Sequence, residues 1–94
     1  MDEITHQRSG TRGAFVIVRD DQTIAQMTYT VGGPTAIIDH TEVDDVLRGT
    51  GTGARLVKAA VHWARAEKLQ LMPLCPFAKS VFDKTPDYGD VLKK

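Results

Sequence analysis

The apolar and polar positions in the first half of the chain alternate in a way that predicts a sheet. Residues 14–18 are β-branched and aromatic, and residues 23–31 alternate so that one face is more apolar than the other, which is typical of a half-buried strand. Two aspartates at residues 20–21 indicate a turn, so these runs predict a hairpin. After Gly-Gly-Pro at residues 32–34, residues 35–43 predict a third strand. We therefore expect an antiparallel meander of strands.

A helical period replaces this alternation further along the chain. A predicted helix from about residue 51 to about residue 67 carries one apolar stripe, formed by Leu56, Val57, Ala60, Val61 and Ala64. Residues 69–74 predict a short fourth strand, which Pro73 would end. A second helix is expected from about Pro76 to Lys84, because proline fits a first helical turn and Thr85-Pro86 would close it. The order β-β-β-α-β-α predicts an α/β (α+β) fold with a mixed sheet and a right-handed crossover helix.

Length and composition are those of one domain. The chain has 94 residues, of which 41% are hydrophobic and 26% are charged, as in an ordinary globular protein with one core. We therefore expect a single domain over residues 1–94. Residues 1–11 are polar, and we expect this segment to be flexible apart from a pairing of Ile4 at a sheet edge.

Charge, apolar runs and cysteine content indicate which partners and which location to expect. Twelve Lys and Arg residues balance twelve Asp and Glu residues, so no overall field favours nucleic acid or an anionic membrane. No apolar run approaches the roughly 20 residues that span a bilayer, and the first residues carry no apolar export signal. One cysteine cannot form an internal disulfide, which indicates either a reducing compartment or a fold that needs no disulfide. We expect a cytoplasmic protein without nucleic-acid or membrane partners.

A glycine-rich turn before the first helix is the most informative segment. It reads Arg48-Gly49-Thr50-Gly51-Thr52-Gly53. Unpaired backbone N–H groups and the helix dipole make such a turn a site for negative charge, and Gly51 and Gly53 lack the Cβ atoms that would keep a bulky anion away. The spacing Arg-x-x-Gly-x-Gly differs from a P-loop and from the Gly-x-Gly-x-x-Gly of dinucleotide folds. The alternative is a helix-entry turn whose glycines serve only backbone geometry.

The turn and its neighbouring motifs resemble one enzyme family. Arg48-x-x-Gly51-x-Gly53, between a strand and an amphipathic helix, resembles the pyrophosphate-binding motif of the GNAT superfamily of acyl-CoA-dependent N-acyltransferases. The motifs that resemble its small stand-alone subgroup are His40-Thr41-Glu42-Val43, Pro73-Leu74-Cys75-Pro76-Phe77 and Pro86-Asp87-Tyr88. The resemblance covers about residues 13 to 92. The chain lacks the two helices that full-length members carry between their first two strands, which help to shape the acceptor site.

The resemblance implies a truncated GNAT-like fold that binds acetyl-CoA and no metal. Backbone N–H groups of the turn would receive the pyrophosphate, and Arg48 would supply positive charge or buttress the turn. The third strand, from about Ile38 to Val43, would pair with the pantetheine arm as an added strand, and the thioester would lie in the gap between the third and fourth strands. The implied cofactor-binding residues are Ile38, Thr41, Val43, Leu47, Arg48, Gly49, Thr50, Gly51, Thr52 and Gly53.

Cys75 is the first candidate for catalysis. It precedes Pro76, where a helix N-cap is expected, and a helix N-terminus lowers the pKa of a thiol by stabilising the thiolate. Two roles follow: a nucleophile that carries the acyl group in a ping-pong route, or an acid that protonates the departing CoA thiolate. The alternative is a small buried side chain without a chemical role.

Three further side chains are candidates for moving protons. His40 and Glu42 lie two residues apart on one strand and therefore share a face, from which either could deprotonate an amine beside the thioester. The alternative for both is a polar side chain that faces solvent. The resemblance gives Tyr88 the role of proton donor to the thiol end of CoA, and the alternative is that Tyr88 caps the core.

Together the turn and the resemblance predict a function. We expect transfer of an acetyl group from acetyl-CoA to a primary amine of a small molecule or of a protein. One alternative is a module that binds or senses acyl-CoA without efficient turnover, because the missing helices leave no acceptor pocket. Another is a nucleotide or phosphate binder that uses the same turn.

Overall fold

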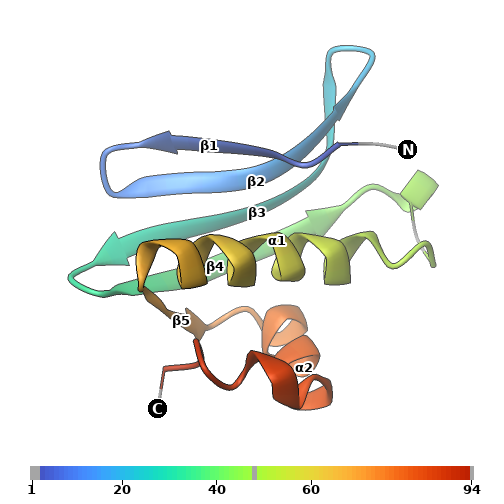
Figure 1. Ribbon diagram of the computed structural model, residues 1–94. Coiled ribbons are helices and arrows are strands. Elements are labelled where there is room, and N and C mark those ends of the chain that lie inside the picture. The colour runs from blue at the N-terminus through green and yellow to red at the C-terminus, as the bar shows by residue number, and fades with distance from the viewer. Residues whose placement is uncertain (1–2, 48, 94) are drawn as a thin grey trace.

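Five strands form one mixed sheet (Figure 1). The computed structural model describes residues 3–47 and 49–93. The strands are β1 (Thr5–Ser9), β2 (Arg12–Arg19), β3 (Gln22–Gly32), β4 (Thr35–Val43) and β5 (Gln70–Pro73). The first four follow one another as antiparallel neighbours, and β5 returns to lie parallel to β4. The predicted meander and mixed sheet are confirmed.

Two helices and two short 3-10 turns complete the described chain. The helices are α1 (Thr52–Glu67) and α2 (Pro76–Lys84), and the 3-10 turns are η1 (Asp45–Leu47) and η2 (Pro86–Tyr88). α1 ends where Lys68 takes a left-handed conformation with a φ of 57°, and Pro76 occupies the first turn of α2. Both helices have the predicted bounds to within one residue. Neither is long and apolar enough to cross a membrane.

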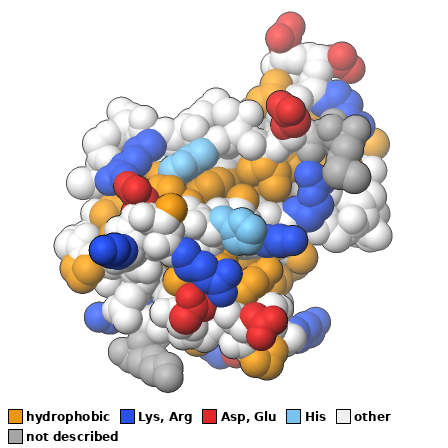
Figure 2. Space-filling view, viewed as in Figure 1, with side chains coloured by type: hydrophobic (Ala, Val, Ile, Leu, Met, Phe, Trp, Pro, Cys, Tyr) orange, Lys and Arg blue, Asp and Glu red, His pale blue; other side chains and the backbone are white. Residues whose placement is uncertain are grey.

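Charged side chains of both signs are interspersed on the face that carries α1. Figure 2 shows Lys and Arg beside Asp and Glu over this face rather than a broad patch of one sign. Positive and negative side chains are therefore mixed on this face, as they are balanced in the whole sequence. An anion site on this face depends on a local arrangement of donors and not on the field of the whole molecule.

The N-terminal segment differs from the expected flexible arm, because part of it is β1. This exposed edge strand pairs with β2 along its whole length. Aromatic contacts explain the pairing: the His6 ring stacks on Phe15 at a centroid distance of 4.3 Å and meets Trp63 of α1 edge-on at 5.0 Å. Such contacts anchor a strand whose polar composition alone does not predict it.

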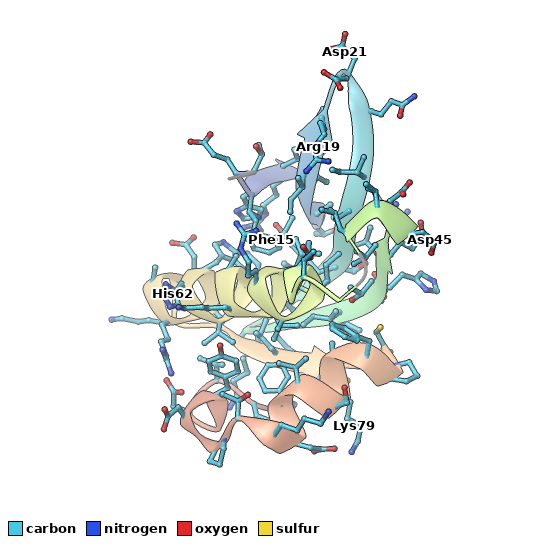
Figure 3. The ribbon with its side chains drawn as sticks, turned by 90° about the vertical axis from the view of Figure 1, so that its right-hand side faces the viewer. Phe15, Arg19, Asp21, Asp45, His62 and Lys79 are labelled. Carbon is cyan, nitrogen blue, oxygen red and sulfur yellow. The ribbon has the colours of Figure 1, made fainter. Side chains whose placement is uncertain are left out.

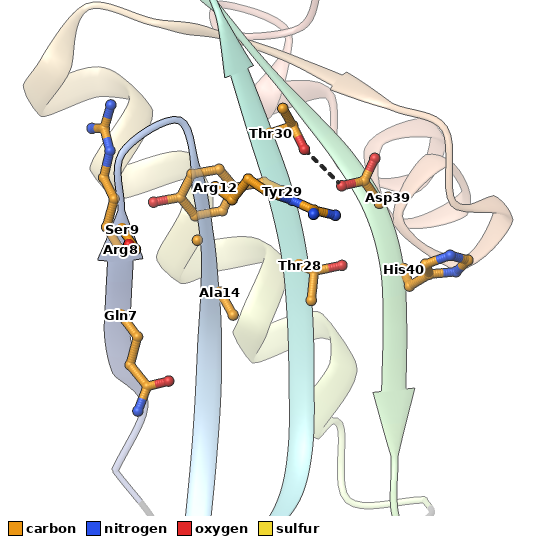
Figure 4. Close-up of a pocket in the computed structure, with 11 residues that line it drawn as sticks. Gln7, Arg8, Ser9, Arg12, Ala14, Thr28, Tyr29, Thr30, Asp39 and His40 are labelled. Carbon is orange, nitrogen blue, oxygen red and sulfur yellow. Dashed lines mark hydrogen bonds between the residues drawn. The ribbon is translucent and has the colours of Figure 1, made fainter.

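Both helices pack on the same face of the sheet. The predicted apolar stripe of α1 is buried, and it shares one core with sheet side chains such as Met27 and Ile38 and with Phe82 of α2. Figure 3 shows Phe15 pointing from β2 toward α1, and His62 is an exposed residue of that helix. Figure 4 shows both helices behind the strands. No helix of the described chain covers the opposite face of the sheet.

β4 and β5 separate before β4 ends. They pair along four residues, up to Ile38, and β4 then runs on to Val43 beside β3 alone. At the point of separation the register of β3 and β4 shifts, which leaves Asp39 as an extra residue of β4. A bulge of this kind re-aims the backbone groups that follow it. In the described structure, the edge of residues 39–43 on the β5 side therefore has no partner strand.

Candidate active site

A cavity of about 540 Å³ lies between the glycine-rich turn, the end of β4 and α2. Most of the expected cofactor-binding residues line it: Thr41, Val43, Leu47, Gly49, Gly51, Thr52 and Gly53. Ile38 and Thr50 do not line it, and Arg48 lies outside the described residues. The volume is in the range of small-molecule and cofactor sites.

Gly51 shapes the entry to α1. It is the N-cap residue, with φ 77° and ψ 12°, and no side chain caps this helix end. This left-handed conformation favours glycine. The N–H groups of a first helical turn have no acceptor further back in the helix, and a Cβ atom at Gly51 would meet nothing within 4 Å. The turn therefore offers both donors and space for an anion.

Gly53 also makes room for a neighbouring helix. It is buried in the first turn of α1, and a Cβ atom there would overlap the ring of Phe77 from α2. The missing side chain lets the two helices approach each other. Gly53 also lines the cavity, so the expectation that Gly51 and Gly53 make room for an anion stays a prediction, and the contact with Phe77 is an additional reason for a glycine at position 53.

Two threonine hydroxyls hold the turn in place. Thr50 Oγ1 donates to the carbonyl oxygen of Leu47 at 2.5 Å and accepts from Thr52 Oγ1 at 2.6 Å. Thr52 is only 3% exposed, so its hydroxyl needs a partner within the protein. Thr50 therefore fixes the conformation of the turn instead of lining the cavity.

The carbonyl group of Ile38 marks the point at which β4 and β5 separate. It accepts the backbone N–H groups of Leu74 at 3.1 Å and of Cys75 at 3.3 Å. Ile38 itself is buried, so its side chain belongs to the core and not to the cavity wall. The unpaired edge of β4 thus runs from the cavity to a point beside Cys75.

The Cys75 thiol lies at the N-cap of α2 and is almost fully buried. Burial raises the pKa of this thiol, but hydrogen bonds from the backbone N–H of Ala78, the Thr41 side chain and the N–H groups of Phe77 and Thr41 outweigh it, so that the pKa is lowered. Thr41 Oγ1 is buried and makes no hydrogen bond of ordinary length and angle among the described residues, so its interaction with the thiol is weaker than such a bond. The placement at a helix N-terminus and its effect on the thiol agree with the sequence analysis.

The other candidates for proton transfer lie away from this cavity. His40 and Glu42 are exposed and line separate hollows, neither of which includes Cys75 or the glycine-rich turn. Tyr88 packs edge-on against Phe82 at a centroid distance of 5.8 Å and contacts the core, as its alternative interpretation expects. None of these three side chains lines the cavity at the glycine-rich turn.

One wall of the cavity is not predicted by the sequence. α2 contributes Phe77, Ser80, Val81 and Lys84 to it. Phe77 is 42% exposed, and Lys84 brings a positive charge to the same wall. The signal that points to this wall is an exposed aromatic residue followed at helical spacing by polar and basic residues.

The chain matches the sequence profile of one family over most of its length. The family is described as GCN5-related N-acetyl-transferase, and the match covers residues 14–91. The chain belongs to this family. The resemblance of its motifs to GNAT proteins is confirmed by this match. A comparison with curated proteins finds no match.

Solved structures of GNAT proteins share the fold. A GCN5-like protein from Staphylococcus aureus is 34% identical, with a TM-score of 0.73 over 95% of this chain and 87% of the other. A ribosomal-protein-alanine N-acetyltransferase from Brucella melitensis is 15% identical, with a TM-score of 0.67 over 81% of this chain and 62% of the other. An aminoglycoside acetyltransferase from a soil metagenome, solved with sisomicin, is 19% identical, with a TM-score of 0.63 over 93% and 60%. The last two likenesses concern the fold alone, and this chain spans about three fifths of those proteins.

Proposed function

We propose that this GNAT protein transfers the acetyl group of acetyl-CoA to a primary amine. The observation that carries the proposal is a continuous path: the cavity at the glycine-rich turn adjoins the unpaired edge of β4, which ends beside Cys75. Membership of the family supports an acyl-CoA donor.

The path could bind acetyl-CoA along its length, with the pyrophosphate at the glycine-rich turn and the thioester beside Cys75. At one end, the N–H groups of the first turn of α1 and the Lys84 ammonium would hold the pyrophosphate. Between them, the unpaired backbone groups of residues 39–43 would bond the pantetheine amides as an added strand does. At the other end, the thioester would lie near Thr41 and Cys75, where a backbone N–H of β4 can polarise its carbonyl group.

The reaction needs an uncharged amine and a departing thiolate. The amine nitrogen attacks the thioester carbonyl carbon, a C–N bond forms, the C–S bond breaks, and the CoA sulfur takes up the proton that the nitrogen releases. A Cys75 thiolate would act as the base that deprotonates the amine, or would accept the acetyl group first in a ping-pong route. The lowered pKa of Cys75 favours these two roles over protonation of the leaving group.

A matched pair of glycine variants tests acetyl-CoA binding. Gly51 and Gly33 have φ values of 77° and 59°, and a Cβ atom at either would meet nothing within 4 Å. Alanine at either position should therefore cost similar stability, about 1–2 kcal/mol, but only Gly51→Ala places a methyl group on the cavity wall. We expect the acetyl-CoA Kd to rise about tenfold for Gly51→Ala, measured by calorimetry with ATP as a negative control, and to be unchanged for Gly33→Ala. Equal affinities of the two folded variants would refute the pyrophosphate site, and CoA release with a panel of amines distinguishes transfer from binding without turnover.

Mass spectrometry of the intact protein tests the role of Cys75. In the ping-pong route, acetyl-CoA without an amine adds one acetyl group to Cys75, and Cys75→Ala loses nearly all transfer. As a general base, Cys75 forms no adduct and its loss slows transfer by roughly 10² to 10⁴-fold. Full activity of Cys75→Ala without any adduct would return this residue to a structural role.

A further inference from the structure

The helix-free face of the sheet carries a second hollow, of about 740 Å³. It arises because two small side chains meet on neighbouring strands, where Ala14 of β2 lies opposite Thr28 of β3. The larger His40 of β4 lies opposite Thr28 on its other side. Longer side chains surround this low centre, among them Gln7 and Arg12 (Figure 4). The surface is therefore concave at a place where a sheet face would otherwise be flat.

Two opposite charges face each other across this hollow. Figure 4 shows the Arg12 side chain from β2 and the Asp39 side chain from β4 pointing toward one another over β3. The Asp39 carboxylate is held by the Thr30 hydroxyl, which donates to Asp39 Oδ2 at 3.2 Å. Arg12 is exposed, and its guanidinium has no ion pair or hydrogen bond among the described residues. The hollow therefore offers a cation and an oriented anion to a ligand that carries both charges.

The hollow adjoins the point at which β4 and β5 separate. Ile38, the last paired residue of β4, holds the N–H groups of Leu74 and Cys75, and the next two residues, Asp39 and His40, line the hollow. Figure 4 shows His40 projecting from β4 on the side away from β3, which is the side of β5. The hollow and the acetyl-CoA cavity thus reach the same segment of β4 from opposite faces.

We propose that this hollow binds the acceptor, and that the acceptor is a small amine that also carries a carboxylate. The carboxylate would pair with Arg12, for which a guanidinium is well suited, and the ammonium would lie at Asp39. The inference rests on the proposed acetyl transfer. The ammonium loses one proton to the Cys75 thiolate or, from this face of the sheet, to His40, which passes it to water. Its nitrogen forms the new C–N bond, the thioester C–S bond breaks, and the second proton released by the nitrogen ends on the CoA sulfur.

A panel of paired amines tests the substrate class. Glycine, β-alanine and γ-aminobutyrate are compared with their carboxamides, which keep the amine and lose the negative charge, and with a peptide that carries a lysine and blocked ends. We expect kcat/KM, followed by release of free CoA, to be about tenfold or more higher for at least one of the three acids than for its amide. Equal rates for acids and amides, or a preference for the blocked peptide, would overturn the proposal.

Variants assign that preference to the hollow. Arg12→Gln should raise KM about tenfold for the preferred acid, leave kcat little changed and abolish the preference over the amide. Lys58→Gln is the charge-matched control, because Lys58 is exposed on α1 and lines neither hollow nor cavity. Ala14→Leu fills the centre of the hollow and should also raise KM. A preference for the acid that survives in folded Arg12→Gln would place the carboxylate elsewhere.

Direct binding separates failure of this inference from failure of the proposed function. In NMR titrations of the CoA-loaded protein with the N-acetylated acid, we expect shifts of the amide signals of Ala14, Thr28 and Thr30. If acetyl-CoA binds at Gly51 but the acid shifts none of these signals, the acceptor site is refuted while donor binding stands. If acetyl-CoA does not bind at all, the proposed function fails first.

Discussion

Replacing Gly53 by alanine should destabilise the protein, although alanine is the better helix former. In a helix, Gly→Ala contributes about 0.5–1 kcal/mol. Against this, the new Cβ atom overlaps the Phe77 ring, and overpacking costs about 1–3 kcal/mol. Because Phe77 is 42% exposed, its ring can move toward solvent, which keeps the cost in the lower half of this range, at about 1.5–2 kcal/mol. The expected net loss is about 1 kcal/mol in the free energy of unfolding.

The same substitution should have the opposite sign once the ring is removed. In a Phe77→Ala background nothing opposes the new Cβ atom, so Gly53→Ala should stabilise α1 by about 0.5–1 kcal/mol. Urea unfolding of the wild type, the two single variants and the double variant forms a double-mutant cycle, for which we expect a coupling energy of about 1.5–2 kcal/mol. A loss of equal size in both backgrounds would refute the contact between Gly53 and Phe77 as the reason for the glycine.

Three further substitutions test the site and the fold. Thr41→Val removes a hydroxyl that lowers the pKa of Cys75, so iodoacetamide should label the thiol more slowly at pH 7; an unchanged rate would show that the hydroxyl plays no part. Lys84→Gln should weaken acetyl-CoA binding a few-fold, less so in high salt, whereas Lys79→Gln, which lies outside the cavity, should have no effect on calorimetric affinity. Partial burial lowers the pKa of His6, so the fold favours the neutral ring, and stability should be constant above about pH 6.5 and fall below it. His6→Phe should remove this acid-side loss in urea midpoints measured at pH 5 and pH 8, and a loss that persists would assign it to other groups.

Most elements follow from local sequence, because their signals do not depend on distant residues. The apolar stripe of α1 has helical spacing, and its burial in the structure is what that spacing predicts. The bounds of α2 follow from Pro76 at its start and Pro86 just beyond its end, since proline fits a first helical turn and restricts the residue before it. β1 is the exception, because its anchor is the contact of His6 with Phe15 and Trp63, which are distant in sequence.

Local sequence signals also predict part of the candidate site. The glycine-rich turn has a recognisable spacing, but spacing cannot tell that Gly51 borders open space while Gly53 borders Phe77. Strand alternation correctly places His40 and Glu42 on one side of β4. It cannot place them relative to Cys75, because the bulge at Asp39 changes which side chains of β4 face the cavity.

One face of the described sheet carries no helix, and this bears on whether donor and acceptor can be bound at the same time. β4 is accessible from the helix side at the cavity, through Thr41 and Val43, and from the opposite side at the second hollow, through Asp39 and His40. A donor and an acceptor bound at these two places would approach one segment of β4 from different faces, and neither would have to leave before the other entered. Cys75, which is buried among residues of the helix side, is better placed to influence the thioester than to hand an acetyl group across the strand. The two-sided arrangement therefore favours direct attack by the amine in a complex that holds both substrates, with Cys75 as a base or a positioning group rather than as an acyl carrier.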